Sequence, residues 1–185
     1  RAGAPRGTTA PVADKPGVVA KDNNKLSFER KRRGAEPLYW EDVEVGQELE
    51  PLEKGVYTVS EMNRYGINVQ YAPRVLTEAH GGPGGDGTER QAGWRPMDFG
   101  MQRTCWLGQL CTDWMGDAGT LKRLSSQIRL ANSIGDINVA KGEVTKKYIE
   151  KGEHLVDCDI FIENQGGLVS TPGGATIALP SKKTG

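Results

Sequence analysis

"DFGMQRTCWLGQLCTDWMGD", residues 98 to 117, is the stretch that decides the fold. Its large apolar side chains occupy more than half of the circumference of a helix, so nearly every side of that helix should contact protein. These side chains belong to Met101, Cys105, Trp106, Leu107, Leu110, Cys111, Trp114 and Met115. The spacing predicts a buried central helix, and other elements must then wrap around it.

The residues that follow this helix have the alternating pattern of antiparallel strands. In "LVDCDIFIEN", residues 155 to 164, apolar and acidic side chains fall on opposite faces. The apolar face consists of Val156, Cys158, Ile160 and Ile162. Further strands are expected at 121–132, at 135–148 and, after a turn at 170–174, at 173–180. A meander of such strands around one helix predicts an α+β protein with the hot-dog architecture.

The composition is that of an ordinary domain with many turns. The chain has 185 residues, 36% apolar and 26% charged, and its 25 glycines argue against a plain helical bundle. No apolar run approaches the ~20 residues that span a bilayer, and the first residues lack the order of a secretory signal. The three cysteines form no C-x-x-C pair, so neither a zinc site nor a disulfide framework is expected. We therefore expect a soluble, cytoplasmic protein with no metal and no membrane partner.

The charge is divided unequally along the chain. Residues 1–35 carry nine Lys or Arg and three Asp or Glu, which leaves fifteen and twenty-one of the 24 of each for the rest. Residues 1–36 have too few large apolar side chains to offset the entropy of ordering, so they predict an extended basic arm before a single domain at 37–182. The run Glu29–Arg33 is typical of a solvated tail, and contact with another subunit is a better explanation of it than nucleic acid.

Several segments together resemble the MaoC-like acyl-CoA dehydratases and hydratases. "PLYWEDVEVGQEL" (Pro37–Leu49) and the following strand, which ends in "YTVSEMNRY", resemble the opening of that domain. The overlapping stretch "VSEMNRYGINV", residues 59 to 69, predicts a short helix with Ser60 as its N-cap. "RPMDFGMQRTCWLGQLCTDWMGD" (Arg95–Asp117) resembles its central helix. "KGEVTKKY" and "CDIFIENQGGLVSTPGGATIALP" resemble its closing strands. The resemblance covers the chain from about residue 37 to residue 180.

The resemblance implies hydration of a trans-2-enoyl thioester of coenzyme A, with coenzyme A as part of the substrate and no other cofactor. In that family an Asp and a His orient and deprotonate the water, and a backbone N–H at the start of the central helix holds the enolate oxygen. Here that donor would be Gly100, where the absence of a side chain lets the thioester approach the backbone. Alternatively, Gly100 only allows the helix to begin close to the sheet.

The stretch "YGINVQYAPRVLTEAHGGPGGDG", residues 65 to 87, does not contain the Asp and His of the family at their usual spacing. No aspartate stands where the first acid is expected, and the nearest polar residue, Asn68, cannot act as a base. Two readings remain. His80 can abstract the proton from water while Asp86 fixes its tautomer, or His80 is a loop histidine beside a glycine-rich tip. The other histidine, His154, is expected in a surface turn.

Asp98, two residues before Gly100, offers a further possibility. A carboxylate at this place either caps the helix or, as in hot-dog thioesterases, attacks the thioester or activates water. Capping is the better explanation.

The resemblance leaves three functions open. The chain is an active enoyl-CoA hydratase, a subunit without the catalytic pair that supports a catalytic partner, or an acyl-CoA thioesterase that works through Asp98. A homodimer or a heterodimer with another hot-dog chain is expected in each case, because a single curved sheet leaves its edge and its ligand face open. The missing aspartate favours the supporting subunit.

Overall fold

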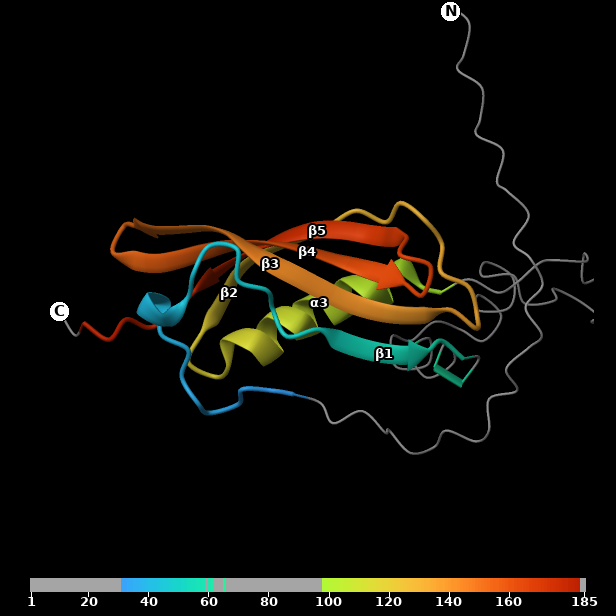
Figure 1. The fold of residues 1–185 in the computed structure, drawn as a ribbon, viewed down its shortest axis with the longest axis horizontal. Coiled ribbons are helices and arrows are strands. Elements are labelled where there is room, and N and C mark those ends of the chain that lie inside the picture. Colours follow the sequence, from blue (N-terminus) through green and yellow to red (C-terminus); the bar gives the residue numbers. More distant parts are fainter. Residues whose placement is uncertain (1–30, 59, 62–64, 66–97, 184–185) are drawn as a thin grey trace, which may run out of the picture.

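A five-stranded antiparallel sheet curls around one long helix in the computed structural model, which describes residues 31–58, 60, 61, 65 and 98–183 (Figure 1). The elements in chain order are η1 (Trp40–Asp42), β1 (Leu52–Val56), α3 (Gly100–Met115), β2 (Thr120–Ser126), β3 (Ile137–Glu150), β4 (Glu153–Asn164) and β5 (Val169–Ala178). The strand order is β1-β3-β4-β5-β2. This arrangement confirms the predicted α+β class and the hot-dog fold.

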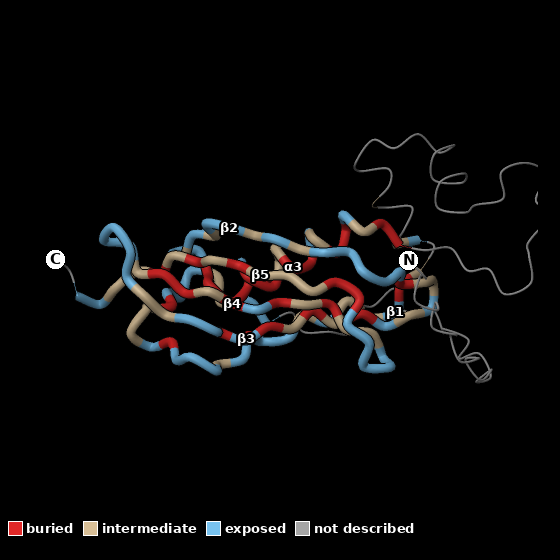
Figure 2. The backbone as a smooth tube through the Cα atoms, turned by 90° about the horizontal axis from the view of Figure 1, so that it is seen from above, coloured by how far each residue is buried: buried red, intermediate tan, exposed pale blue. Residues whose placement is uncertain are grey.

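The central strand β4 carries the pattern that the sequence indicated. Its four predicted apolar residues are at most 1% exposed. The alternation of buried and exposed residues along the sheet is visible from above in Figure 2. The inward residues face the apolar side of α3, where Leu107, Leu110 and Cys111 are also at most 1% exposed. The buried residues of β4, which recur every 2 residues, and those of α3, which recur every 3.6 residues, therefore form one core.

Strand β2 does not lie beside β3, so the predicted meander is wrong at this point. The meander comprises β3, β4 and β5, and β2 pairs with the outer side of β5. Residues 127–136 form no hairpin because their first part continues along β5, where Gln127 N donates to Pro172 O at 2.8 Å and Arg129 N to Ser170 O at 3.0 Å. The remainder crosses to the opposite side of the sheet to begin β3.

The predicted turn at 170–174 is part of β5, and the turn lies earlier, between β4 and β5. There Asn164 Oδ1 accepts hydrogen bonds from the backbone of Gly166 and Leu168, and Gly167 has a φ of +76°. The glycine at 173 serves a different purpose, since a Cβ there would lie 2.3 Å from Ser125 O of β2. It permits close approach of two strands rather than a reversal.

The helix α3 was predicted to be buried on nearly every side, but one side of it is exposed. Met101 is 60% exposed, and Cys105 and Thr112 are exposed along the same side. We call these three residues the open stripe. Polar side chains are buried in their stead: Gln102, Arg103 and Asp113 are all at most 8% exposed. The prediction from apolar character alone was therefore wrong for part of the buried surface of α3.

The end of α3 rests on residues that the sequence assigned to the basic arm. Arg33 donates from Nε to the carbonyl oxygen of Trp114 at 3.0 Å, and its backbone N–H donates to Asp113 O. A cation at this end of a helix is favourable because the last carbonyl groups lack intrahelical partners. Gly116 follows with a φ of +71°, and a Cβ there would lie 2.9 Å from Gly34 O. Within the described part, the arm thus contacts the domain from its first described residue, because Lys31 Nζ also lies 2.8 Å from Glu50 Oε1.

In the short helix after β1, Ser60 is not the N-cap residue that the sequence predicts. Ser60 is already helical, and the Thr58 hydroxyl accepts the backbone N–H of Glu61 at 3.1 Å. Thr58 therefore performs the capping that was predicted for Ser60. Most of this helix lies outside the described residues.

No helix in the described part of the chain is long and apolar enough to cross a membrane.

Candidate functional site

The start of α3 is the point on which the predicted chemistry depends. Gly100 is the first residue of the helix, and Phe99 is the N-cap residue, with no side-chain hydrogen bond to the first turn. The first N–H groups of such a helix have no intrahelical acceptor and point out of its end. A Cβ on Gly100 would lie 2.3 Å from Ile128 Cδ1, so the residues after β2 lie directly against this position. The contact explains the glycine structurally, and the role of Gly100 as an oxyanion donor stays a prediction.

Asp98 does not cap the helix, which corrects the interpretation favoured from the sequence. Its side chain is fully buried and its Oδ2 lies 2.8 Å from Nε of Arg103. Its Oδ1 accepts the backbone N–H of Asn132 at 3.4 Å. Within the described residues neither Asp98 Oδ2 nor Arg103 Nε has a hydrogen-bond partner, so their contact is an ion pair. The carboxylate faces into the protein, toward the helix side that carries Arg103.

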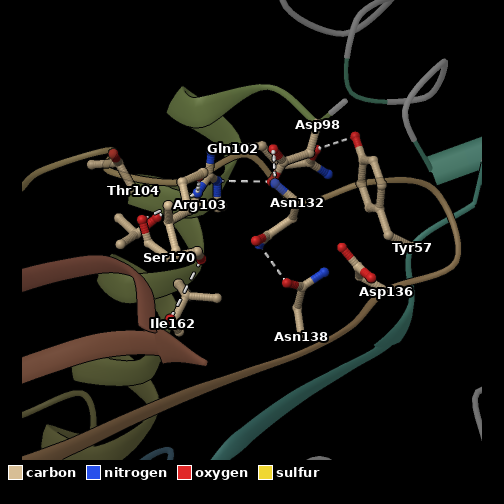
Figure 3. A network of polar contacts seen from close by, with 12 residues as sticks. Tyr57, Asp98, Gln102, Arg103, Thr104, Asn132, Asp136, Asn138, Ile162 and Ser170 are labelled. Atoms are coloured by element: carbon tan, nitrogen blue, oxygen red, sulfur yellow. Dashed lines mark hydrogen bonds and ion pairs between the residues drawn. The ribbon is translucent and has the colours of Figure 1, made fainter. Parts of the chain in front are cut away.

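Arg103 is the centre of this buried cluster, as Figure 3 shows. From the first turn of α3, its Nη1 donates to Leu130 O at 2.6 Å and to Thr171 Oγ1 at 2.8 Å. Ser170 O lies farther away, at 3.5 Å from the same nitrogen. The planar guanidinium thus connects the start of the helix, the crossing segment 127–136 and strand β5.

Burial dominates the electrostatics of this pair. Burial raises the pKa of Asp98 from 3.8 to about 6, whereas the nearby Arg103 lowers it. Burial lowers the pKa of Arg103, and the charge of Asp98 opposes that shift. Both directions have the same meaning: removal from water costs the charged forms more than their mutual attraction returns.

Two further polar pairs lie in the same region. The Tyr57 hydroxyl donates to Gln102 Oε1 at 2.9 Å, and burial raises the pKa of Tyr57 above its ordinary value. Asn132 Nδ2 donates to Asn138 Oδ1, and both side chains are at most 1% exposed. The remaining amide groups, Asn132 Oδ1 and Asn138 Nδ2, have no hydrogen-bond partner among the described residues. Buried polar groups therefore concentrate at the starting end of α3.

The predicted catalytic pair cannot be placed next to this cluster. His80 and Asp86 both lie outside the described residues, so their convergence stays a prediction. His154 is not in a turn, because it lies in β4 with its ring 5.2 Å from that of Trp40 between centroids. Among the described residues, no group of three His, Cys, Asp or Glu side chains is arranged to hold a metal ion.

The sequence contained one signal for the cluster that the prediction did not use. Arg103 lies in a helix expected to be buried on nearly every side, and a buried charge requires a partner. Asp98, five residues earlier, is the nearest acid toward the start of the helix. The pairing of Arg103 with Leu130 and Thr171 had no comparable signal, because those contacts depend on the strand order.

Comparison of the sequence with protein-family models and with curated proteins finds no match. Comparison of the structure finds the same fold in several solved proteins. The (R)-hydratase from A. caviae involved in PHA biosynthesis is 24% identical over 75% of this chain and 98% of its own, with a TM-score of 0.57. R-hydratase PhaJ1 from Pseudomonas aeruginosa is 17% identical over 80% and 89%, with a TM-score of 0.63.

Two other solved structures extend the comparison. The MaoC-like dehydratase from Rhodospirillum rubrum is 14% identical over 80% of this chain and 99% of its own, with a TM-score of 0.61. The ChsH1-ChsH2 complex from Mycobacterium tuberculosis is 16% identical over 74% and 98%, with a TM-score of 0.54. At these identities the likeness establishes the fold: the chain is a hot-dog domain of the kind found in R-hydratases and MaoC-like dehydratases.

Proposed function

We propose that this chain is a subunit of an enoyl-CoA hydratase, acting on trans-2-enoyl thioesters of coenzyme A. The observation that carries the proposal is the start of the central helix at Gly100, within a fold shared with R-hydratases and a MaoC-like dehydratase. The segments that resemble the MaoC-like family support it independently of the fold comparison. Coenzyme A enters as part of the substrate, and hydration needs no further cofactor.

In the proposed reaction, water adds across the C2–C3 double bond of the thioester. A base takes one proton from water while the oxygen bonds to C3, and the π electrons move to the thioester oxygen as an enolate. The backbone N–H of Gly100 stabilises that charge, and proton transfer to C2 completes the addition. The amide suits this role because a helix start carries unsatisfied donors and a partial positive charge.

The base is supplied in one of two ways. In the first, His80 takes the proton and Asp86 fixes its tautomer. In the second, which the missing family aspartate favours, a partner chain supplies the Asp and the His and this chain widens the acyl site. A ring-bearing or branched enoyl group is the substrate that would require a widened site.

The partner is proposed to be a second hot-dog domain. The open stripe of α3 is exposed, and β2 has a neighbour on only one side within the described strands. Both features are surfaces that association covers. The solved ChsH1-ChsH2 complex, which has this fold, supports the idea that such domains assemble with one another.

The alternative thioesterase function gains no support from Asp98. A nucleophilic or water-activating carboxylate must reach the thioester carbon, but the Asp98 side chain is fully buried and faces Arg103 at 2.8 Å. If the alternative were correct, release of free coenzyme A from an acyl-CoA would vanish in Asp98→Asn.

The proposal is tested by the loss of the enoyl-thioester absorbance band. The purified chain is assayed with crotonyl-CoA and with a ring-bearing enoyl-CoA, as wild type, His80→Ala and the matched control His154→Ala. A supporting subunit leaves crotonyl-CoA nearly unchanged until its partner is added. Brisk turnover by the chain alone that His80→Ala abolishes and His154→Ala retains would instead make this chain catalytic. Absence of hydration with and without a hot-dog partner would refute the proposed function.

A further inference from the structure

Arg103 connects three segments that are far apart in the sequence. Its Nε faces Asp98 Oδ2 just before the helix, and its Nη1 donates to Leu130 O and Thr171 Oγ1. Arg103 is only 2% exposed, so water does not compete with these protein groups for its N–H donors. Because the guanidinium is planar and rigid, its three contacts hold the segments in one relative arrangement.

Two of these segments adjoin Gly100. Asp98 lies two residues before it in the chain. Ile128, from the crossing segment, fills the space beside its Cα, and that segment is held to β5 by the bond from Arg129 N to Ser170 O. A change at Arg103 therefore alters the position of the helix start relative to the crossing segment that lies beside Gly100.

We propose that Arg103 is a positioning residue for the thioester oxygen, fixing the direction of the Gly100 N–H through its contacts with Asp98, Leu130 and Thr171. The inference rests on the proposed function, since it names what sets the geometry of the same site. Oxyanion donors act only when they point at the developing charge, and a displacement of about 1 Å costs roughly 10²-fold in rate. A point charge cannot replace the fork that makes the three contacts.

The environment of Arg103 favours positioning over a purely stabilising role. A buried ion pair contributes little stability compared with apolar side chains of the same size, because both charges lose their hydration. Elsewhere α3 is held by apolar packing of Leu107, Leu110 and Cys111. The polar contacts occur at the starting end, where direction matters for an amide donor.

The test compares Arg103→Lys with Arg123→Lys, a matched control at an exposed position of β2. In the full chain, with its partner where one is required, kcat and KM are measured for crotonyl-CoA, and the Kd of unreactive butyryl-CoA by calorimetry. Positioning predicts that folded Arg103→Lys binds butyryl-CoA within about threefold of wild type but loses about 10²-fold in kcat. An unchanged kcat per folded molecule, or an equal loss in Arg123→Lys, would overturn the inference.

A second variant covers the case in which Arg103→Lys does not fold. Thr171→Val keeps the guanidinium and the ion pair but removes one acceptor, so it should fold and lose about tenfold in kcat at constant Kd. Full kcat in folded Thr171→Val, with Arg103→Lys unfolded, would show that Arg103 serves stability alone.

A spectroscopic measurement separates this inference from the proposed function if the wild type hydrates nothing. Phe99–Gly100 is the only Phe–Gly step in the sequence, so labelling Phe with carbonyl ¹³C and Gly with ¹⁵N identifies the Gly100 amide. A shift of that resonance with butyryl-CoA in wild type that is lost in Arg103→Lys, or in Thr171→Val, supports positioning even without turnover. No binding, no shift in wild type, or the same shift in the variants overturns it.

Discussion

Replacing Arg103 with methionine should destabilise the protein by an amount that grows with pH. Methionine puts an unbranched apolar side chain in the place of arginine, but it leaves the buried Asp98 carboxylate without its cation. Asp98 must then remain protonated in the folded state. At pH 7 that costs about 4 kcal/mol for a group whose ordinary pKa is 3.8, at about 1.4 kcal/mol per pH unit.

The sign follows from proton binding. In wild type the pKa of Asp98 is raised to about 6, so the folded state binds more protons than the unfolded state between about 4 and 6. The contribution of Asp98 to stability is therefore complete below this window, falls as pH rises through it and is constant above it. Without Arg103 the folded pKa rises further and the fall continues. The difference in unfolding free energy between wild type and Arg103→Met should thus grow by about 1.4 kcal/mol per pH unit from pH 6 to pH 8.

A pH-independent part adds to this difference. Thr171 Oγ1 is buried and loses its donor, which costs about 1–3 kcal/mol, whereas Leu130 O belongs to an exposed residue and its loss costs less because water can replace the donor. Urea unfolding at pH 6, 7 and 8 measures the total, with Arg123→Met as the exposed control. The double variant Asp98→Asn/Arg103→Met should lose the growth with pH because no carboxyl remains. A difference that is flat from pH 6 to pH 8, or equal growth in the double variant, would refute the reasoning.

Two simpler measurements test the packing. Gly173→Ala should lower the unfolding free energy by about 1–3 kcal/mol in urea, because its Cβ would lie 2.3 Å from a β2 carbonyl oxygen, whereas neighbouring Gly174→Ala should be nearly neutral since its Cβ meets atoms only at 3.7 Å; equal effects would contradict the strand pairing. In the monomeric folded chain, Ellman's reagent should modify Cys105 quickly and reach Cys111 and Cys158 only on unfolding, because both are buried and burial raises the pKa of each thiol to about 12; simultaneous reaction of all three would show that the core is open.

Local periodicity accounts for what the sequence predicted well. The central helix and β4 each bury one set of side chains whose spacing matches a single element, so their patterns survive any arrangement of neighbours. The same logic failed for Met101 and Cys105, which are apolar yet exposed. Their burial depends on which segment packs against that side of α3, and the apolar character of a side chain does not show which segment that is.

Strand order and the polar cluster were beyond local reasoning. Residues 127–136 look like the connection of a hairpin, but hydrogen bonds hold their first part along β5, and the remainder crosses the sheet to β3. Arg103 finds Leu130 and Thr171 only because of that path. The buried asparagines, Asn132 and Asn138, are likewise paired by the crossing segment and the start of β3. A charged residue in an apolar helix predicts that a partner exists, but the identity of the partner depends on the tertiary structure.

The two ends of α3 are held by different physics, and this difference bears on the proposed chemistry. At the far end, Gly116 and Arg33 close the helix, while large apolar side chains fill the adjoining core. Apolar packing tolerates small rotations, because dispersion contacts have no preferred angle. At the starting end, Asp98 and Arg103 replace that packing with charged and hydrogen-bonded contacts, which weaken steeply when they are misaligned. Burying the Asp98–Arg103 pair costs free energy because both charges lose their hydration. The pair nevertheless lies beside the Gly100 amide, whose N–H must keep its direction in the proposed hydration. The desolvation cost is therefore located at the site whose geometry that reaction requires.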